Sequence, residues 1–210
     1  MFVKSIMIPR NNCYVVQHDR SLREALQLLE TNKIDALPVL KGDQYVGILT
    51  RYQLYKSFFE SELEKEQFLN EVKSGDIVTH KDEFLSGDEI FERTLIALKD
   101  FPLLAVCDED KRLLGIVTRF DVLEQFQSAF GMKKSGVRIA FTSVETEGQI
   151  ARLSEIAHQF HESIISLVTF DETDKLVRRI VLKIEKKDNI HEFIQQLEQA
   201  GFRILDIVED

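Results

Sequence analysis

The sequence predicts a mixed α/β (α+β) chain, in which a duplicated unit of strands and helices is followed by a ferredoxin-like βαββαβ domain. Two observations lead to this prediction. The run Gly47–Arg51 returns as Gly115–Arg119, displaced by 68 residues, and self-similarity at a fixed displacement indicates a repeated structural unit. Beyond the small and basic linker 131–136 the apolar pattern changes, and its new order is typical of a two-layer sandwich.

Each copy of the repeat is expected to form a short strand, a helix, two strands joined by a tight turn, and a second helix. An apolar stripe with the i, i+4, i+7 spacing of a helix begins at Leu22 and returns at Phe91. Apolar runs separated by Gly-Asp or acidic turns follow both stripes. These runs predict strands at 36–40 and 45–49 in the first copy, and at 103–106 and 113–117 in the second.

Capping residues and composition mark the limits of these elements. Ser21 and Glu24 fit a capping box at the start of the first long helix. The segment Lys56–Ser74 lacks Pro and Gly and is rich in Glu and Lys, so we expect a helix that bridges the two copies. The predicted limits are 1–57 for the first copy, 58–74 for the bridge and 75–131 for the second copy.

The segment 137–210 has a different periodicity. Val137, Ile139 and Phe141 alternate with smaller or more polar residues, which predicts a half-buried strand. A helix is expected at 149–161, and another from a cap at Asp188 to a stop at Gly201. Further strands are expected at 163–170, 176–184 and 202–208. The order βαββαβ is that of a ferredoxin-like fold.

Composition and charge narrow the classes of function. The 210 residues are 44% hydrophobic and 30% charged, as in a folded soluble protein. The net charge of −9 argues against broad electrostatic binding of nucleic acid or anionic lipid. No apolar run spans a membrane and no signal-peptide pattern is present, so we expect a cytoplasmic protein. Cys13 and Cys107 form no disulfide framework and are expected to be core residues.

The end of each copy resembles the signature of tandem CBS motifs, in which glycine and a hydrophobic residue precede Thr-x-x-Asp. The second copy, GIVTRFD from Gly115 to Asp121, matches in full. The first, GILTRYQ from Gly47 to Gln53, departs at its last position, although DALPVL at 35–40 supplies a proline frequent in the family. Segment 137–210 resembles an ACT domain through its element order and its Gly148. The layout is similar to CBS–ACT proteins of the acetoin-utilisation type and to bacterial cyclic di-AMP-binding CBS proteins.

Two interpretations apply to Thr118 and Asp121. A Thr followed three residues later by an acid is a capping box that any helix can use. The same helix terminus presents free amides to a phosphate, which Thr118 and Arg119 can bind, while Asp121 can accept from two ribose hydroxyls. The resemblance implies this second arrangement, with adenine held by the strand Leu103, Leu104 and Ala105.

The first copy is expected to bind less well. The resemblance implies a corresponding site at Thr50 and Arg51 beside the strand residues Ala36, Leu37 and Pro38. Gln53 stands there in place of the acid, and a neutral amide is a poorer acceptor for a diol. We therefore expect one strong site, at Thr118, and a weak or vacant site at Thr50.

The resemblance implies a regulatory protein that senses an adenine nucleotide between the two CBS copies and relays it through a dimer and the ACT domain. It allows AMP, ADP, ATP or cyclic di-AMP, and cyclic di-AMP is slightly favoured because bacterial CBS proteins of this kind are frequent receptors for it. A homodimer is expected. The alternative is a ligand-independent dimeric scaffold that docks a client protein through the aromatic residues Phe58, Phe59, Phe126 and Phe130.

Other candidate sites are weaker. The chain shows no nucleophile–base set, phosphate loop or metal cluster, so we expect no enzymatic activity, cofactor or metal. His158 and His161 are within metal-ligand spacing, but their charged neighbours indicate a solvated helix face. Glu145 and Glu147 flank Gly148 where many ACT domains hold an amino acid. Two acids would repel a ligand carboxylate, so a structural or dimerising role is favoured there.

Overall fold

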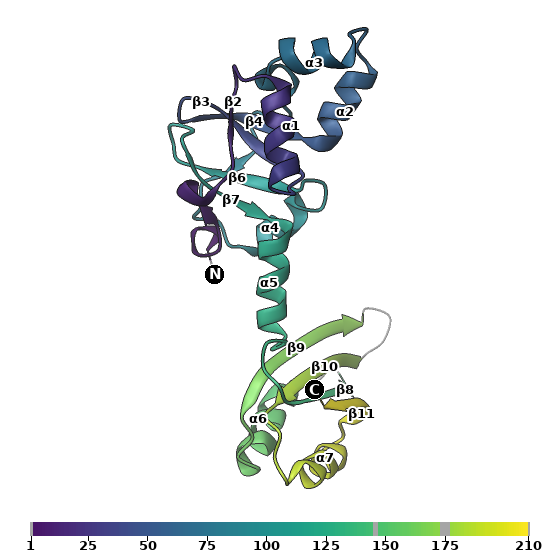
Figure 1. Cartoon of the computed structure of the whole chain (residues 1–210). Helices are drawn as coiled ribbons and strands as arrows, with labels where there is room; N and C mark the ends of the chain where they lie inside the picture. Colours follow the sequence, from purple (N-terminus) through teal and green to yellow (C-terminus); the bar gives the residue numbers. More distant parts are fainter. Residues whose placement is uncertain (1, 145–146, 173–176, 210) are drawn as a thin grey trace. The chain divides into compact units, whose positions relative to one another are not determined.

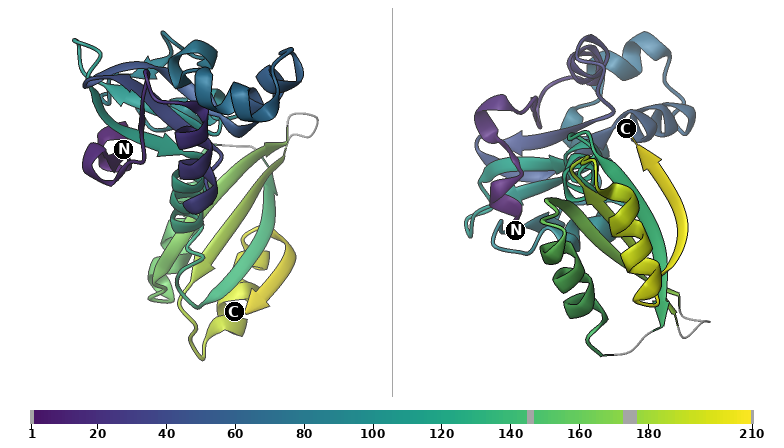
Figure 2. Two further views of the ribbon diagram at one scale, coloured as in Figure 1. Left: turned by 45° about the horizontal axis from the view of Figure 1, so that its top comes forward. Right: turned by 90° about the horizontal axis from the view of Figure 1, so that it is seen from below.

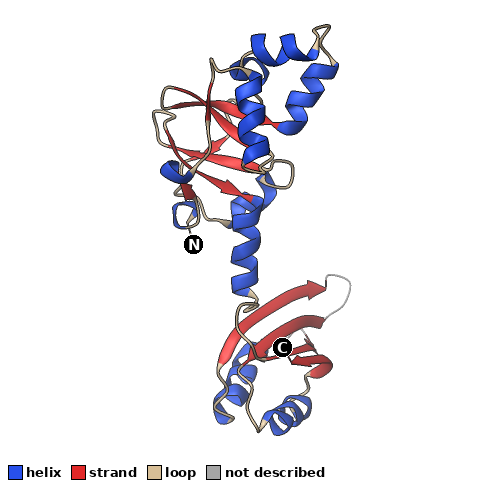
Figure 3. Cartoon of the chain, in the orientation of Figure 1, coloured by secondary structure: helices blue, strands red, loops and turns tan. Residues whose placement is uncertain are grey.

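The computed structural model describes residues 2–144, 147–172 and 177–209, and the chain divides into two compact units, Met1–Leu123 and Glu124–Asp210 (Figure 1). The first unit holds most of the repeat and the second holds the βαββαβ domain. Helices and strands are both substantial in each unit (Figure 3). Within the described ranges, no helix combines the length and the apolar character needed to cross a membrane.

The first copy consists of β2 (Val16–Gln17), α1 (Leu22–Thr31), β3 (Ala36–Lys41), β4 (Gln44–Thr50) and α2 (Arg51–Phe59). β2 runs parallel to β3, and β3 runs antiparallel to β4. The Ser21 hydroxyl accepts a hydrogen bond from the Glu24 amide at 3.3 Å, which confirms the predicted start of α1. The apolar side of α1 is buried in the core of this copy.

The predicted continuous helix over Lys56–Ser74 is wrong. α2 ends at Phe59, α3 runs over Lys65–Glu71, and a 3₁₀ turn covers Ser74–Ile77. Acidic residues crowd the segment 60–64, where they oppose the negative end of the α2 dipole. The break folds Phe68 back onto Phe58, with ring centroids 5.3 Å apart, and both rings join the core of the first copy.

The second copy repeats this arrangement with β5 (Phe84–Leu85), α4 (Glu92–Ala97), β6 (Leu103–Cys107), β7 (Leu113–Thr118) and α5 (Arg119–Ala129). β5 runs parallel to β6, and β6 runs antiparallel to β7. The apolar stripe predicted from Phe91 is only partly confirmed. Phe91 precedes the short helix α4, and the buried positions are Thr94 and Leu98, one helical turn apart.

The leading segment of each copy crosses to the sheet of the other copy. β1 (Ile8–Pro9) pairs antiparallel with β7, and Thr79 bridges Ile48 in β4. The repeated motif glycines make room for these segments. A Cβ on Gly115 would lie 2.4 Å from the Ile8 carbonyl oxygen, and a Cβ on Gly47 would lie 2.7 Å from the Thr79 carbonyl oxygen. Glycine is therefore required at both positions by strand packing.

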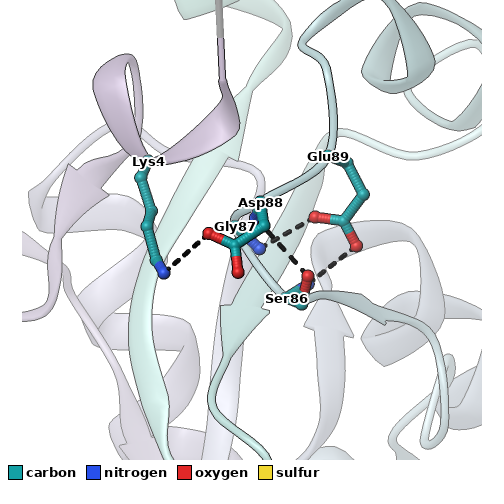
Figure 4. A network of polar contacts seen from close by, with 5 residues as sticks. All are labelled: Lys4, Ser86, Gly87, Asp88 and Glu89. Atoms are coloured by element: carbon teal, nitrogen blue, oxygen red, sulfur yellow. Dashed lines mark hydrogen bonds and ion pairs between the residues drawn. The ribbon is translucent and has the colours of Figure 1, made fainter.

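A polar network fastens the N-terminal segment to the second copy (Figure 4). Lys4 Nζ lies 2.9 Å from the Asp88 carboxylate, and the Lys4 amide donates to the Gly87 carbonyl at 3.0 Å. The Glu89 carboxylate accepts from the amides of Ser86 at 2.9 Å and Gly87 at 2.8 Å. Burial raises the pKa of Glu89, but these amide hydrogen bonds outweigh it and hold the pKa below its usual value.

The two copies share one apolar core. The turns of their hairpins meet: the Tyr45 amide donates to the Lys111 carbonyl at 2.8 Å, and the Leu113 amide donates to the Asp43 carbonyl at 3.1 Å. Behind them lies a cluster of buried residues from both sheets: Ala36, Leu40, Tyr45, Ile48, Leu103, Ala105, Cys107, Leu113 and Ile116. Neither copy can bury these side chains alone, so the pair is the structural unit.

The second unit contains β8 (Val137–Val144), α6 (Gln149–Gln159), β9 (Ile164–Glu172), β10 (Val177–Ile184), α7 (Ile190–Gln199) and β11 (Arg203–Glu209). The sheet order is β11-β8-β10-β9 and all neighbours are antiparallel. α6 and α7 cover the same face of the sheet (Figure 2), where Phe160 packs edge-on against Phe193. This topology confirms the ferredoxin-like prediction.

Helix limits in the second unit follow the glycines. Gly148, with φ +83°, immediately precedes α6, and Gly201, with φ +89°, follows α7. These left-handed conformations favour glycine. The cap predicted at Asp188 is wrong by one residue. Asn189 occupies the position before α7, and its side chain donates to the Phe160 carbonyl at 3.2 Å instead of capping the helix.

Candidate functional site

A cavity of about 440 Å³ lies in the first unit, where segments of both copies meet. Its volume is in the range of small-molecule sites. The strand crossover brings the N-terminal segment into its wall, beside residues that precede β3 and β6 and residues around the start of α5. The lining residues are Ile8, Asn12, Cys13, Tyr14, Ile34, Asp35, Ala36, Pro102, Leu103, Ile116, Thr118, Arg119 and Phe120.

Thr118 and Asp121 bond to each other at the start of α5. The Thr118 amide and hydroxyl donate to Asp121 Oδ2 at 2.7 and 2.6 Å, and the Asp121 amide lies 3.3 Å from Thr118 Oγ1. Thr118 lines the cavity, whereas Asp121 is half-buried and is not a lining residue. The capping interpretation therefore describes the geometry of this helix start.

The Arg119 guanidinium holds the end of α4. Its Nε donates to the carbonyls of Leu98 at 2.8 Å and Phe101 at 3.0 Å, and its Nη2 donates to the Lys99 carbonyl at 3.2 Å. Carbonyls at a helix C-terminus lack partners within the helix, and a charged donor satisfies them well. Arg119 also lines the cavity, so it combines a structural role with a position beside the site.

Arg51 has the same role in the first copy. Its Nη2 donates to the carbonyls of Leu29 at 3.1 Å and Ile34 at 2.8 Å, which close the end of α1. Its Nε lies 3.3 Å from the Asp35 carboxylate. In both copies the motif arginine therefore donates to the carbonyls that follow a helix, an arrangement called here the arginine clamp. The motif pattern alone predicts only phosphate binding for these two arginines.

Four of the predicted binding residues meet at the cavity: Ala36, Leu103, Thr118 and Arg119. The others lie outside its lining. Leu37, Pro38, Leu104 and Ala105 are buried within β3 and β6, and Thr50 and Arg51 lie at the start of α2. Alternate residues of a strand point to opposite faces, so a continuous run of strand residues cannot line one cavity.

The motif pattern missed several lining residues. Tyr14 and Phe120 contribute aromatic rings that are 51% and 68% exposed, and Asp35 contributes a carboxylate. Phe120 lies inside the GIVTRFD motif, and an aromatic residue beside the predicted helix start could have indicated that its ring lines the site. Tyr14 and Cys13 had no such signal, because only the strand crossover brings their segment to the second copy.

The Thr50 side of the pair is built differently. Phe101 precedes β6 by two residues, as Ile34 precedes β3, so the two positions correspond. The Phe101 ring contacts the His80 ring, with centroids 3.9 Å apart. His80 is held in turn by the Tyr45 hydroxyl, which donates to the His80 carbonyl at 2.8 Å. A ring pair therefore lies at the position that corresponds to Ile34 in the lining of the cavity.

The two cysteines have different surroundings. Cys107 is fully buried, and burial raises the pKa of its thiol to about 12. Cys13 is half-buried in the cavity wall, where its thiol lies 3.3 Å from the Pro9 carbonyl oxygen. Burial also raises the pKa of Cys13. The core interpretation is confirmed for Cys107 and is incomplete for Cys13.

A second cavity, of about 470 Å³, lies in the second unit around the start of α6. Glu147 and Gly148 line it, together with Arg178 from β10, whose guanidinium lies 3.2 Å from the Asp171 carboxylate. Glu145 lies outside the described residues, so the expected acid pair is described only in part. The expectation that this domain has a structural or dimerising role, and does not bind an amino acid there, stays a prediction.

The histidine pair on α6 and the loop that follows it is exposed. The rings of His158 and His161 have centroids 6.4 Å apart. Within the parts of the chain that the structure describes, no group of three or more His, Cys, Asp or Glu side chains is placed to hold a metal ion.

Comparison with known proteins gives a family match and several relatives. The model of the CBS domain family matches residues 3–60 and 75–128, more than half of the chain. An inosine-5'-monophosphate dehydrogenase from Korarchaeum cryptofilum is 28% identical over 203 residues, which cover 90% of this chain and 40% of that protein. The chain thus spans well under half the length of this relative.

Two solved structures with bound nucleotides resemble the chain. CBSX2 of Arabidopsis thaliana in complex with AMP is 31% identical, with a TM-score of 0.51, covering 63% of this chain and 98% of that one. CbpB of Listeria monocytogenes in complex with cyclic di-AMP is 26% identical, with a TM-score of 0.51, covering 60% of this chain and 94% of that one.

Proposed function

The chain belongs to the CBS domain family, and from this we propose that it is a ligand-sensing regulatory protein, not an enzyme, which binds an adenine nucleotide in the cavity at Thr118. The observation that carries the proposal is the Thr118–Asp121 pair at the start of the eleven-residue helix α5, beside that cavity. The helix terminus suits a phosphate and the Asp121 carboxylate suits a ribose diol. The rings of Tyr14 and Phe120 offer faces for adenine.

The two nucleotide-bound relatives support the ligand class. One was crystallised with AMP and the other with cyclic di-AMP, and both ligands carry adenine, ribose and phosphate. Within this class we favour cyclic di-AMP slightly, with AMP, ADP and ATP as the other candidates. The His80–Phe101 ring pair and the neutral Gln53 both support a weaker or vacant site on the Thr50 side.

We further propose a homodimer in which α2 takes part. Tyr52, Tyr55 and Phe59 are 72%, 43% and 86% exposed and lie at i, i+3 and i+7, on one face of α2. A row of aromatic rings on one helix face is costly to leave in water and is typical of an interface. A second copy of the chain would cover it by a two-fold, self-complementary contact.

The βαββαβ domain is proposed to relay the ligand signal. Its sheet order and the left-handed Gly148 before α6 support the resemblance to an ACT domain. A ligand can change the arrangement of such modules only to the extent that it binds one arrangement more tightly than another. The coupling can therefore be measured as the difference in nucleotide affinity between the full chain and a variant whose two modules are held in one arrangement.

Thermal unfolding against AMP, ADP, ATP and cyclic di-AMP tests the binding proposal. A ligand at about 100 times its dissociation constant stabilises the folded state by roughly 2.7 kcal/mol, which raises the Tm by about 5–10 °C for a chain of this size. Asp121→Ala should abolish the increase. Gln53→Ala is the matched control at the equivalent position of the first copy and should keep it.

Alkylation of Cys13 locates the ligand. Cys13 lines the cavity and Cys107 is fully buried, so a maleimide should modify Cys13 first in the native protein. A nucleotide in the cavity should slow this modification in proportion to its occupancy. A ligand that raises the Tm without slowing modification of Cys13 binds elsewhere and contradicts the proposed site.

The ligand-independent scaffold remains the alternative. Of its four aromatic residues, Phe58 packs on Phe68 and Phe130 stacks on Phe170 within the second unit, while Phe59 is the most exposed of them. This use of two rings inside the chain reduces the surface available to a client. A Tm that no nucleotide raises, together with partner binding that Asp121→Ala leaves unchanged, would favour the scaffold.

A further inference from the structure

We propose that the cavity at Thr118 selects adenosine ligands that carry one phosphate group per adenosine and discriminates against di- and triphosphate chains. This inference rests on the proposed function and narrows its ligand class by charge. AMP and cyclic di-AMP meet the requirement, whereas ADP and ATP do not. The argument depends on the charges around the cavity and on the hydrogen bonds that already occupy them.

The lining of the cavity carries little positive charge, and outside the lining the opposite charges of Arg10 and Asp121 both act on the Cys13 thiol in its wall. Among the described residues that line it, Arg119 is the one cation and Asp35 is the one acid. The Nε and Nη2 of Arg119 already donate to three carbonyls at the end of α4, at 2.8, 3.0 and 3.2 Å. A phosphate can use the remaining charge of this guanidinium, but a phosphate chain needs several cationic or amide donors.

The N-terminus of α5 is also largely occupied. The Asp121 carboxylate accepts from both the amide and the hydroxyl of Thr118, at 2.7 and 2.6 Å. A carboxylate at this position already compensates the positive end of the helix dipole. One phosphate can share the remaining amides, whereas each additional phosphate meets the negative charge of Asp121 without a new donor.

Asp35 adds negative charge to the lining of the cavity, and its ion pair with Arg51 offsets part of that charge. Its side chain is 81% exposed, and its carboxylate lies 3.3 Å from Arg51 Nε. Arg51 is held in turn by two carbonyls at the end of α1, so it does not line the cavity and cannot reach a phosphate without leaving them. At a separation of about 8 Å in water, each extra unit of negative charge on a ligand costs a factor of about two to three in affinity.

Dissociation constants of AMP, cyclic di-AMP, ADP and ATP, measured by calorimetry in Mg²⁺-free buffer, test this inference. ATP carries about two more negative charges than AMP at neutral pH, so it should bind about fivefold more weakly or worse. The difference should shrink at high salt, which screens charge. Protection of Cys13 from maleimide, measured for each nucleotide, ensures that the affinities refer to this cavity.

Asp35→Asn should narrow the ratio of ATP to AMP dissociation constants about fivefold, because it removes the charge that repels the two additional charges of ATP. Asp19→Asn is the matched control. It removes the same charge at the other end of α1, about 15 Å away along a ten-residue helix, and should leave the ratio unchanged.

The outcomes separate this inference from the proposed function. If ATP protects Cys13 and binds as tightly as AMP, the charge selection is refuted while adenine-nucleotide binding stands. If Asp35→Asn and Asp19→Asn shift the ratio equally, the role of Asp35 is refuted. If none of the four nucleotides binds, the proposed function fails and the selection fails with it.

Discussion

Replacing Gly115 by alanine tests the strand crossover that builds the cavity. A Cβ there would lie 2.4 Å from the Ile8 carbonyl oxygen and 3.1 Å from Met7 Sδ. The flexible Met7 side chain can move aside, but the Ile8 carbonyl belongs to β1, whose pairing with β7 sets its position. Therefore β1 or β7 must shift to make room for the Cβ. Overpacking of this kind costs about 1–3 kcal/mol, and 2 kcal/mol corresponds to a fall in Tm of about 4–8 °C.

Two assays follow this perturbation. Thermal unfolding gives the loss of stability, and maleimide modification of Cys13 reports whether the N-terminal segment has left the second copy, because Cys13 follows β1 closely. Gly42→Ala is the control: its Cβ would meet nothing within 4 Å, and its φ of +62° adds only backbone strain of about 1 kcal/mol. A wild-type Tm and an unchanged Cys13 rate in Gly115→Ala would refute the packing argument.

Three further predictions concern the helix ends, the N-terminal network and the dimer. Arg119→Gln should lower the unfolding free energy by about 1–2 kcal/mol in urea, since three carbonyls lose a charged donor; a loss no larger than that of the exposed Arg112→Gln contradicts this. Glu89→Gln should lower stability at pH 7 by less than about 1 kcal/mol after solvent screening. Because the folded-state pKa of Glu89 is lowered, its contribution to stability is present above the unfolded-state pKa and is lost as pH falls through the folded-state pKa. The unfolding curves of the wild type and of Glu89→Gln should therefore converge in acid, and a difference that persists there would contradict the prediction. Phe59→Ser should leave the Tm of the monomer, measured at low protein concentration, within about 1 °C because the ring is 86% exposed. It should weaken the dimer in sedimentation, and unchanged association would exclude the α2 face.

Local signals predicted the elements well. The 68-residue displacement predicted the same element pattern for both copies. Ser21 and Gly148 predicted helix starts that lie within one residue of those in the structure. Periodicity and capping act within one or two turns of chain, so they can be read without knowledge of neighbours.

The prediction failed where a distant contact competed with local preference. The segment 56–74 has the composition of one long helix, but it breaks because Phe58 and Phe68 pack on each other and into the first copy. Helix propensity is a small term per residue, and burial of two aromatic rings outweighs it.

The candidate site could be predicted only in part. The Thr-x-x-Asp motif located the start of α5, and the structure confirms that Thr118 and Asp121 interact there. The arginine clamp needed knowledge of where α1 and α4 end relative to the motif, which comes from the packing of each helix on its sheet.

The order of amino acids is enough to predict the duplicated unit, the βαββαβ order and the residues that begin each motif helix, because these depend on spacing along the chain. The residues that enclose the cavity are known only from the folded chain. Ile8, Cys13 and Tyr14 reach it because β1 pairs with a strand more than 100 residues away, and Asp35 reaches it because the two copies share a core. Pairing over such a separation is chosen by the complementarity of whole sheets, and no local spacing encodes it.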